Sequence, residues 1–353
     1  MRRDEVQKVN VGLIGCGRVS EIHMNAYKNI PEVNVVAVSD INVERAKAFT
    51  QKYKIPKVYD DAVRLFELKD LDFVDVCTPI STHAKLACEA AKHGQNIFLE
   101  KPMARSSKEC DEIIHEVYKN KVKLCVCHNQ LFLPTVMKAK AIVDSGDFPL
   151  VYFKISVRES AELIGAPKWI MTPEQGGALW ETGTHAAYLQ LHFLKSIEKV
   201  WAIGEKIENP LPDYFIVMLT SPEKTVGVIE ISWLAKKEEE TFEFIDSKGR
   251  KIKIVNYNFF MEYPEKPEKN ILEGFYRDQK QIIKKWTKFL LDNIRHRKLA
   301  NSVPQYILIN KFIESIKKDT APPVTPEDGR KTVRLMEYIE ESLNKNKPVT
   351  PGV

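Results

Sequence analysis

The strongest constraint on the fold is an alternation of short β-branched runs with amphipathic helical patterns, which extends from Val9 to about Asn129. Parallel strands need long crossovers, usually helices, so this alternation is typical of βαβ units in a parallel sheet. The expected strands are Val9 to Ile14, Val33 to Ser39, Phe73 to Cys77, Asn96 to Leu99 and Lys123 to Cys127, with a weaker one at Lys57 to Tyr59. We therefore predict an α/β chain whose residues 1–130 form a doubly wound Rossmann domain.

The pattern changes beyond about Phe132, where a helical stretch leads into strands separated by hairpin-like breaks. The run from Val151 to Arg158 alternates apolar and polar residues, as a strand with one buried face does. Further strands are expected at 213–220, 225–233, 241–246 and 250–256, and helices at 273–297, 304–318 and 327–344. Residues 131–353 are predicted to form a second α/β domain around a large, mainly antiparallel sheet. The charge cluster from Lys236 to Glu240 is interpreted as a solvated turn.

Composition and charge favour a soluble globular protein. Hydrophobic residues make up 44% of the 353 and charged residues 29%, which is ordinary for a folded chain. No apolar run reaches the roughly 18 to 20 residues of a membrane span, and the charged start lacks a signal-peptide core, so we expect a cytoplasmic protein without membrane contact. The net charge of +5 is modest, and its densest basic stretch, Lys284 to Lys298, fits the wet face of an amphipathic helix. No nucleic-acid partner is expected.

A glycine turn, Gly15-Cys16-Gly17, separates the first expected strand from a helical pattern. Gly15 permits a tight turn, Gly17 lets the backbone approach a pyrophosphate, and the N–H groups of the helix start, at Arg18 and Val19, can bind that anion. Ser20 occupies the third glycine position of the usual fingerprint. The turn predicts a dinucleotide site.

An acid at the end of the second strand supports this prediction. Asp40 follows the turn by about 20 residues, where a carboxylate accepts hydrogen bonds from the adenosine ribose. The same acid would repel a 2′-phosphate, so NAD is favoured over NADP, while Arg45 nearby is the feature that speaks for NADP.

The tripeptide Glu100-Lys101-Pro102 ends a predicted parallel strand, where ligands bind in open α/β sheets. Lys101 can hold a substrate hydroxyl there and offset the negative charge that develops as the hydroxyl ionises. Pro102 favours a cis bond that fixes the direction of the lysine. The alternative is a surface lysine beside a turn proline.

The segment from Gly176 to His185 is a glycine-rich approach to a helix, in which Glu181 and His185 are four residues apart and can share a face. The carboxylate can orient the imidazole, and histidine is suited to removing an alcohol proton near neutral pH. A structural histidine is the alternative. Spacing also allows a zinc site with His192, but we expect no metal. None of the six cysteines forms a CxxC pair, which favours reduced, buried thiols.

Together these motifs resemble the Gfo/Idh/MocA oxidoreductases, a family that includes inositol dehydrogenases and glucose-fructose oxidoreductase. The resemblance covers nearly the whole chain and rests on the glycine turn with His23 behind it, Thr78-Pro79 followed by His83, Glu100-Lys101-Pro102, the glycine pair before His185, and Pro323 to Gly329. It implies that Thr78, Pro79, His83, Glu100 and Lys101 lie beside a bound NAD.

The resemblance further implies a catalytic lysine at 101, a proton-transferring histidine at 185, and a homodimer or homotetramer formed through the second domain. Three positions depart from the family, and one of them is Ile80, which replaces a frequent Asn after Thr78-Pro79. The family's better-studied dehydrogenases have an Asp four residues before the histidine, where this chain has Glu181, and many members have another Asp where Tyr188 stands.

The expected function is NAD-dependent oxidation of a secondary alcohol of a sugar, cyclitol or sugar derivative, or reduction of the ketone. In this hypothesis Lys101 holds the hydroxyl, His185 removes its proton and Glu181 orients the imidazole. Arg158 and Trp169 are expected in the wall of the cleft, because the polar strand face and the loop before the glycine pair should border it. Two alternatives remain: an NAD-dependent glycoside hydrolase that uses transient oxidation, and a nicotinamide-binding sensor without turnover.

Overall fold

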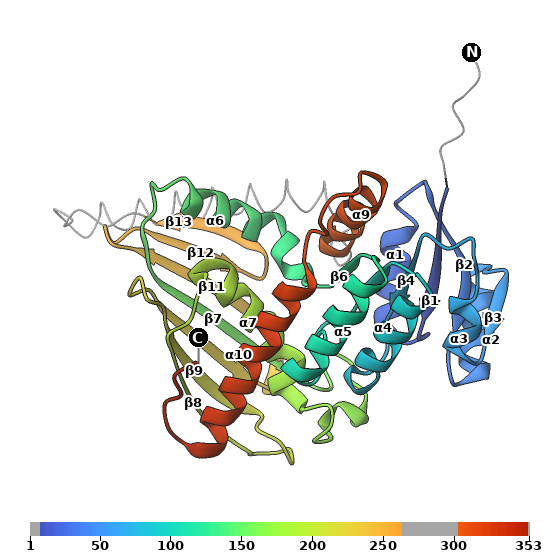
Figure 1. Cartoon of the computed structure of the whole chain (residues 1–353). Coiled ribbons are helices and arrows are strands. Elements are labelled where there is room, and N and C mark those ends of the chain that lie inside the picture. Colours follow the sequence, from blue (N-terminus) through green and yellow to red (C-terminus); the bar gives the residue numbers. More distant parts are fainter. Residues whose placement is uncertain (1–7, 263–302, 352–353) are drawn as a thin grey trace.

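The first domain is built on a parallel sheet. The computed structural model describes residues 8–262 and 303–351. Six parallel strands lie in the order β3-β2-β1-β4-β5-β6, which confirms the predicted doubly wound sheet (Figure 1). The strands are β1 (Val9–Ile14), β2 (Val33–Ser39), β3 (Lys57–Tyr59), β4 (Phe73–Val76), β5 (Ile97–Leu99) and β6 (Leu124–Val126). The helices between them are α1 (Arg18–Tyr27), α2 (Val43–Tyr53), α3 (Ala62–Phe66), η1 (Ile80–Thr82), α4 (His83–Lys92) and α5 (Ser107–Lys119).

The central strands of this sheet are covered on both faces. Every residue of β4, β5 and β6 is buried, and such strands appear in a sequence as nearly continuous apolar runs. The strand order reverses between β1 and β4. Ligands of open α/β sheets bind beyond the carboxyl ends of the strands at such a reversal, so the segments that follow β1, β4 and β5 can all contribute to one site.

The second sheet has seven strands in the order β13-β12-β11-β7-β10-β9-β8, antiparallel except for the β7–β10 pair. They are β7 (Leu150–Ser160), β8 (Lys199–Glu205), β9 (Tyr214–Thr220), β10 (Val226–Ser232), β11 (Leu234–Asp246), β12 (Lys251–Val255) and β13 (Asn258–Glu262). Buried and less buried residues alternate along β7, as predicted. Helix α7 (Gly177–Leu194) packs against β7 and β10 on the inner face, so the mainly antiparallel sheet is confirmed.

The expected turn at 236–240 is wrong, because β11 continues through the charge cluster and pairs with β7. A register irregularity lies between Leu234 and Glu239. Charged residues are typical of solvated turns, but a strand that borders a polar cavity carries the same residue types. The pattern alone does not separate these two environments.

The C-terminal helices return to the first domain. Helix α9 (Val303–Lys317) packs on α1 and on η2 (Asn129–Phe132), and its Phe312 ring lies 5.4 Å from the Phe73 ring and 5.7 Å from the Phe98 ring. Helix α10 (Pro326–Lys345) contacts α5 in the first domain and α7 and β8 in the second (Figure 1). A division at 130/131 stays a prediction, but these helices join both cores. The remaining helices are α6 (Pro134–Asp144) and η3 (Lys168–Met171).

Two expectations concern other parts of the chain. The expected helix at 273–297 and the basic stretch at 284–298 lie outside the described residues. No helix in the described ranges has the length and apolar character that crossing a bilayer requires. All six cysteines are free thiols, and the expected burial holds for four of them, while Cys77 and Cys88 are half-buried.

Candidate active site

The glycine turn leaves room for a ligand against its backbone. Gly15 has φ +89°, and a Cβ there would lie 2.4 Å from the Cys77 carbonyl oxygen, so only glycine fits. At Gly17 a Cβ would meet no atom within 4 Å, so protein packing does not require this glycine. Helix α1 begins at Arg18 without a side-chain cap, which leaves its first N–H groups available for a pyrophosphate. These features fit a dinucleotide.

The incomplete glycine fingerprint has a local explanation. The buried Ser20 hydroxyl donates a hydrogen bond of 2.7 Å to the Gly15 carbonyl, so the side chain that replaces the third glycine closes the turn. Asp40 holds the turn from the other side: its Oδ2 accepts from the Cys16 N–H at 2.9 Å and its Oδ1 from the Asn42 N–H at 2.8 Å. The carboxylate therefore lies directly beside the turn, and Arg45 approaches it at 3.5 Å.

Lys101 extends from the end of β5 to the second domain. Its peptide bond to Pro102 is cis, as expected. The ammonium Nζ lies 2.9 Å from Oε2 of Glu181 and donates to the Glu181 main-chain carbonyl at 3.1 Å. The Lys101 side chain is only 9% exposed. The expected surface alternative for this lysine is therefore wrong, and the ammonium lies at the junction of the two domains.

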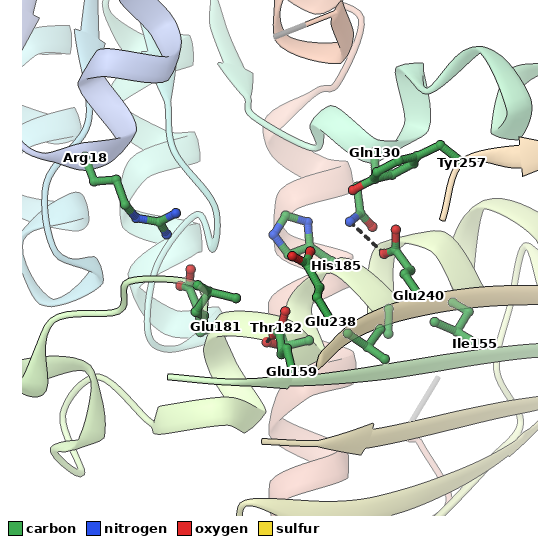
Figure 2. Close-up of a pocket in the computed structure, with 13 residues that line it drawn as sticks. Arg18, Gln130, Ile155, Glu159, Glu181, Thr182, His185, Glu238, Glu240 and Tyr257 are labelled. Atoms are coloured by element: carbon green, nitrogen blue, oxygen red, sulfur yellow. Dashed lines mark hydrogen bonds between the residues drawn. The ribbon is translucent and has the colours of Figure 1, made fainter. Parts of the chain in front are cut away.

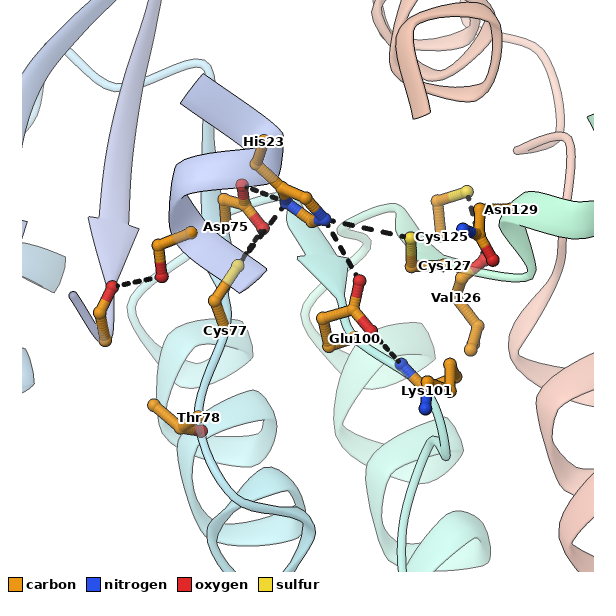
Figure 3. A network of polar contacts seen from close by, with 12 residues as sticks. His23, Asp75, Cys77, Thr78, Glu100, Lys101, Cys125, Val126, Cys127 and Asn129 are labelled. Carbon is orange, nitrogen blue, oxygen red and sulfur yellow. Dashed lines mark hydrogen bonds and ion pairs between the residues drawn. The ribbon is translucent and has the colours of Figure 1, made fainter. Parts of the chain in front are cut away.

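A buried polar network supports the residue before this lysine (Figure 3). The His23 ring lies between Asp75, 2.8 Å from Nδ1, and Glu100, 3.0 Å from Nε2, and Tyr27 donates to Asp75 at 2.6 Å. Burial lowers the pKa of His23, but the charges of Asp75 and Cys77 and the hydrogen bonds to Asp75 and Cys127 together outweigh burial and raise the pKa well above its ordinary value. Burial raises the pKa of Glu100, yet its hydrogen bond to His23 and the nearby positive charges hold that pKa at about 2.

This network fixes the loop that carries Lys101. Because Glu100 stays ionised, its second oxygen can accept the Lys101 backbone N–H, at 3.1 Å. His83 adds a second brace, with its ring nitrogens 2.7 Å from the Pro102 carbonyl and 2.9 Å from the Thr78 carbonyl. His83 is buried and joins the loops after β4 and β5, while Thr78 and Pro79 are half-buried. Its own predicted contact with the cofactor stays a prediction.

His185 bonds to a tyrosine, which corrects the expected carboxylate–imidazole pair. Its Nδ1 lies 2.7 Å from the Tyr188 hydroxyl, while the Glu181 carboxylate lies on Lys101. Burial first, and then the Lys101 charge, lowers the pKa of His185 well below its ordinary value. The Glu181 carboxylate is attracted more strongly by the Lys101 ammonium than by a neutral imidazole. It therefore pairs with Lys101 and not with His185. With Glu181 and His185 bound elsewhere, the three side chains of the zinc alternative do not form a common site.

Tyr188 is in turn held by the segment at the domain boundary. Its hydroxyl accepts from the Gln130 N–H at 3.1 Å and lies 3.3 Å from Oδ1 of Asn129, to which it can donate. The His128 ring stacks on the tyrosine ring with 4.3 Å between centroids. Tyr188, which stands where many family members have an Asp, therefore positions the His185 ring.

A cavity of about 160 Å³ opens beside His185, between Arg18 on the first domain and the inner face of the second sheet (Figure 2). Its lining residues come from α1, η2, β7, α7, β11 and the loops beside them: Arg18, Gln130, Ile155, Val157, Glu159, Ile164, Glu181, Thr182, His185, Ala186, Glu238, Glu240 and Tyr257. The predicted Arg18, Glu181 and His185 are therefore brought to one cavity. The other lining residues were not predicted as site residues, although Glu238 and Glu240 belong to the charge cluster at 236–240 for which a turn is predicted.

The two predicted wall residues do not line this cavity. Arg158 lies on the outer face of the sheet, with its guanidinium 3.5 Å from Glu230. Since side chains alternate along a strand, the cavity is lined by Val157 and Glu159 instead. The mainly apolar face of β7, and not its polar face, borders the site. Trp169 lies in η3, 46% exposed and outside the cavity lining.

Comparison with known proteins extends this picture. Residues 9–128 match the family model described as the oxidoreductase family with an NAD-binding Rossmann fold, and residues 136–251 match the GFO/IDH/MocA C-terminal domain. The chain is 26% identical to an uncharacterized oxidoreductase, YrbE, of Bacillus subtilis over 98% of this chain and 97% of the relative. It is 25% identical to myo-inositol 2-dehydrogenase of Thermotoga maritima, covering 97% and 98% of the two chains.

Among solved structures, the WlbA dehydrogenase of Bordetella pertussis, in complex with NADH and UDP-GlcNAcA, superposes with a TM-score of 0.83 at 18% identity over 98% of this chain and 99% of that one. Fold and site together define a two-domain oxidoreductase that binds a nicotinamide dinucleotide. The chain belongs to the Gfo/Idh/MocA family. It is an NAD-binding enzyme of a family of sugar and cyclitol dehydrogenases.

Proposed function

We propose that this enzyme oxidises a secondary alcohol of a sugar, cyclitol or sugar derivative with NAD, or reduces the corresponding ketone. One observation carries the proposal: Lys101 binds Glu181 one helical turn before His185, near enough for its charge to lower the pKa of His185. An ammonium thus lies close enough to act on a neutral imidazole that lines the cavity. A proton acceptor and a cation that stabilises an ionising hydroxyl are what alcohol oxidation requires.

The chain's own residues have separate tasks in this mechanism. The N–H groups after Gly17 would hold the pyrophosphate of the dinucleotide, and the Asp40 carboxylate would hold its adenosine ribose. Bound NAD supplies the hydride acceptor. Lys101 donates a hydrogen bond to the substrate hydroxyl and His185 accepts its proton, while Tyr188 holds the imidazole through Nδ1. In the reverse direction, the protonated His185 returns the proton to the ketone oxygen.

A substrate panel tests the proposal. Sugars, inositols, sugar acids and nucleotide sugars are incubated with NAD⁺ or NADP⁺, and absorbance of the reduced nicotinamide is followed. We expect at least one secondary alcohol to give NADH, with NAD⁺ preferred because the acid at 40 repels a 2′-phosphate. Release of a free sugar without accumulation of NADH would indicate the hydrolase instead. Tight NADH binding with no turnover of any compound would indicate a sensor.

We also propose that the protein forms a homodimer or homotetramer through the outer face of the second sheet. Trp201, Ile203, Met218 and Val226 lie on three neighbouring strands, and each is more than a third exposed. Trp201 pairs directly with Met218 across β8 and β9. A gathered apolar patch of this kind marks a contact surface more often than a solvated one. Light scattering that returned the mass of one chain would contradict this proposal.

A further inference from the structure

The wall of the cavity opposite the glycine turn is acidic. Glu159 on β7 and Glu238 and Glu240 on β11 line it, and the cation among the described lining residues, Arg18, comes from the first domain (Figure 2). Lys101 is already paired with Glu181. The cation that lines the cavity therefore lies on the dinucleotide side, while the side that would receive the rest of the substrate has three further carboxylates.

One of these carboxylates has an unused oxygen. Glu240 Oε1 accepts a hydrogen bond of 3.0 Å from the Gln130 side-chain amide, whereas Glu240 Oε2 is buried and has no partner among the described residues. The Gln130 side-chain oxygen is likewise buried and unpaired within the described part of the chain. Buried acceptors without a donor are unfavourable in a folded protein, so a ligand that brings a donor to the ionised Glu240 carboxylate is expected at this wall.

The other two carboxylates add charge at this place. Glu159 is fixed by the Thr182 hydroxyl and by the Trp233 indole N–H, which lies 2.9 Å away, so it stays in the wall. Burial, and then the charges of Glu159 and Glu238, raise the pKa of Glu240 to about 7. A neutral hydroxyl can fill one acceptor but leaves this repulsion in place. A cation that donates a hydrogen bond fills the acceptor and also reduces the repulsion between the carboxylates. A carboxylate or phosphate would increase that repulsion.

We propose that the substrate carries a protonated amine, as an amino sugar or aminocyclitol does, and that Glu240 and Gln130 bind that ammonium group. This proposal rests on the proposed dehydrogenase function. Gln130 also contacts the residue that positions the proton acceptor: its backbone N–H donates to the Tyr188 hydroxyl, which holds His185. The ammonium site is therefore built into the same segment that positions the proton acceptor, and Glu240 is a specificity-determining residue.

Matched compounds that differ in one group test this inference. Glucosamine, glucose and glucuronic acid form one series, and an aminodeoxyinositol with its parent inositol forms another. For each compound, kcat/KM with NAD⁺ is measured, and binding to the enzyme saturated with NADH is measured by calorimetry. We expect the amine to exceed its hydroxyl counterpart by about tenfold or more in at least one series, since a hydrogen bond to a charged group is worth that factor.

Two variants locate the effect. Glu240→Gln keeps the side-chain size and should lose most of the preference for the amine while still binding NADH. Glu239→Gln is the matched control, because Glu239 is its exposed neighbour on β11 and does not line the cavity. Its preference should equal that of the wild type.

The outcomes separate the two proposals. Oxidation of neutral sugars at least as fast as amines, with Glu240→Gln unchanged, would overturn the amine site and leave the dehydrogenase in place. Amine binding that depends on Glu240, without NADH formation from any compound, would support the amine site and overturn the dehydrogenase. Absence of amine binding at millimolar concentration overturns the inference as well.

Discussion

The two ends of the active site are made differently. At the dinucleotide end the backbone forms the site: a glycine turn, the start of α1 and one acid after β2, all within about 30 residues of each other. At the substrate end, side chains from η2, β7, α7 and β11 form it, and Gln130 and Glu240 are 110 residues apart. The first end depends on local sequence, and the second depends on how the whole domain packs.

The largest expected effect separates chemistry from cofactor binding. His185→Ala should lower kcat by about 10² to 10⁴ with the best substrate of the panel, because it removes the proton acceptor. Affinity for NADH, measured by fluorescence titration, should stay within a factor of about two, since the glycine turn belongs to the other end. Tyr188→Phe is the companion variant and should show a smaller loss. Equal turnover by His185→Ala and the wild type would remove His185 from the mechanism.

The next effect concerns the network behind Lys101. His23→Leu leaves Asp75 and Glu100 buried without their cation and should lower the free energy of unfolding by about 3 kcal/mol in urea titrations. Glu100 has a folded-state pKa of about 2, below its ordinary value near 4.5, so its stabilising contribution is complete above pH 4.5 and is lost as pH falls toward 2.

The wild-type advantage over His23→Leu should therefore shrink on acidification. His93→Gln, on the surface of α4, serves as the control and should change stability little. A loss no larger than the control's would show that the network contributes nothing.

A pair of glycine variants tests whether backbone space defines the dinucleotide end. Gly17→Val should fold normally, because nothing lies near its Cβ, but should weaken NADH binding by about tenfold or more by occupying the space for the pyrophosphate. Gly15→Val should instead destabilise the fold, by about 3 kcal/mol, because of its positive φ and the Cys77 carbonyl. Unchanged NADH affinity in Gly17→Val would contradict the assignment of the pyrophosphate site.

The smallest expected effect is a shift in pH dependence. Burial and Lys101 lower the pKa of His185, so the imidazole remains an acceptor on moderate acidification. At saturating substrate, kcat for alcohol oxidation should therefore hold down to pH 6.5 and fall only below it. In Lys101→Met, kcat should begin to fall at a higher pH than in the wild type, because loss of the Lys101 charge raises the pKa of His185. A fall in wild-type kcat centred above pH 6.5 would contradict a neutral His185 with a lowered pKa.

The difference between the dinucleotide end and the substrate end of the site also explains which residues could be predicted from the sequence. Gly15, Gly17, Asp40 and the parallel strands follow from local patterns, and the structure confirms their arrangement. Lys101 and His185 could be predicted because their motifs resemble a known family and follow the other family motifs in order along the chain. Glu181 was given the wrong partner because spacing on a helix shows which side chains can meet but not which contact has the lower energy.

The substrate wall escaped prediction for a different reason. Alternation along β7 identified two faces, but the choice of Arg158 required knowing which face borders the cavity. Glu240 was hidden in a charge cluster that resembles a turn, and its significance comes from Gln130, which only the fold brings near. Contacts between distant segments depend on packing, which no local pattern contains.

The central claim is that this chain would hold NAD at the glycine turn and the substrate carbon in this cavity, so that the dinucleotide would take the hydride directly from that carbon. Deuterium transfer tests it most directly. A substrate of the panel, deuterated at the carbon that bears the reacting hydroxyl, is oxidised in ordinary water, and the mass of the reduced dinucleotide is measured. One deuterium in the product NADH is the predicted result. NADH that contains none would contradict direct transfer and with it the proposed roles of Lys101 and His185.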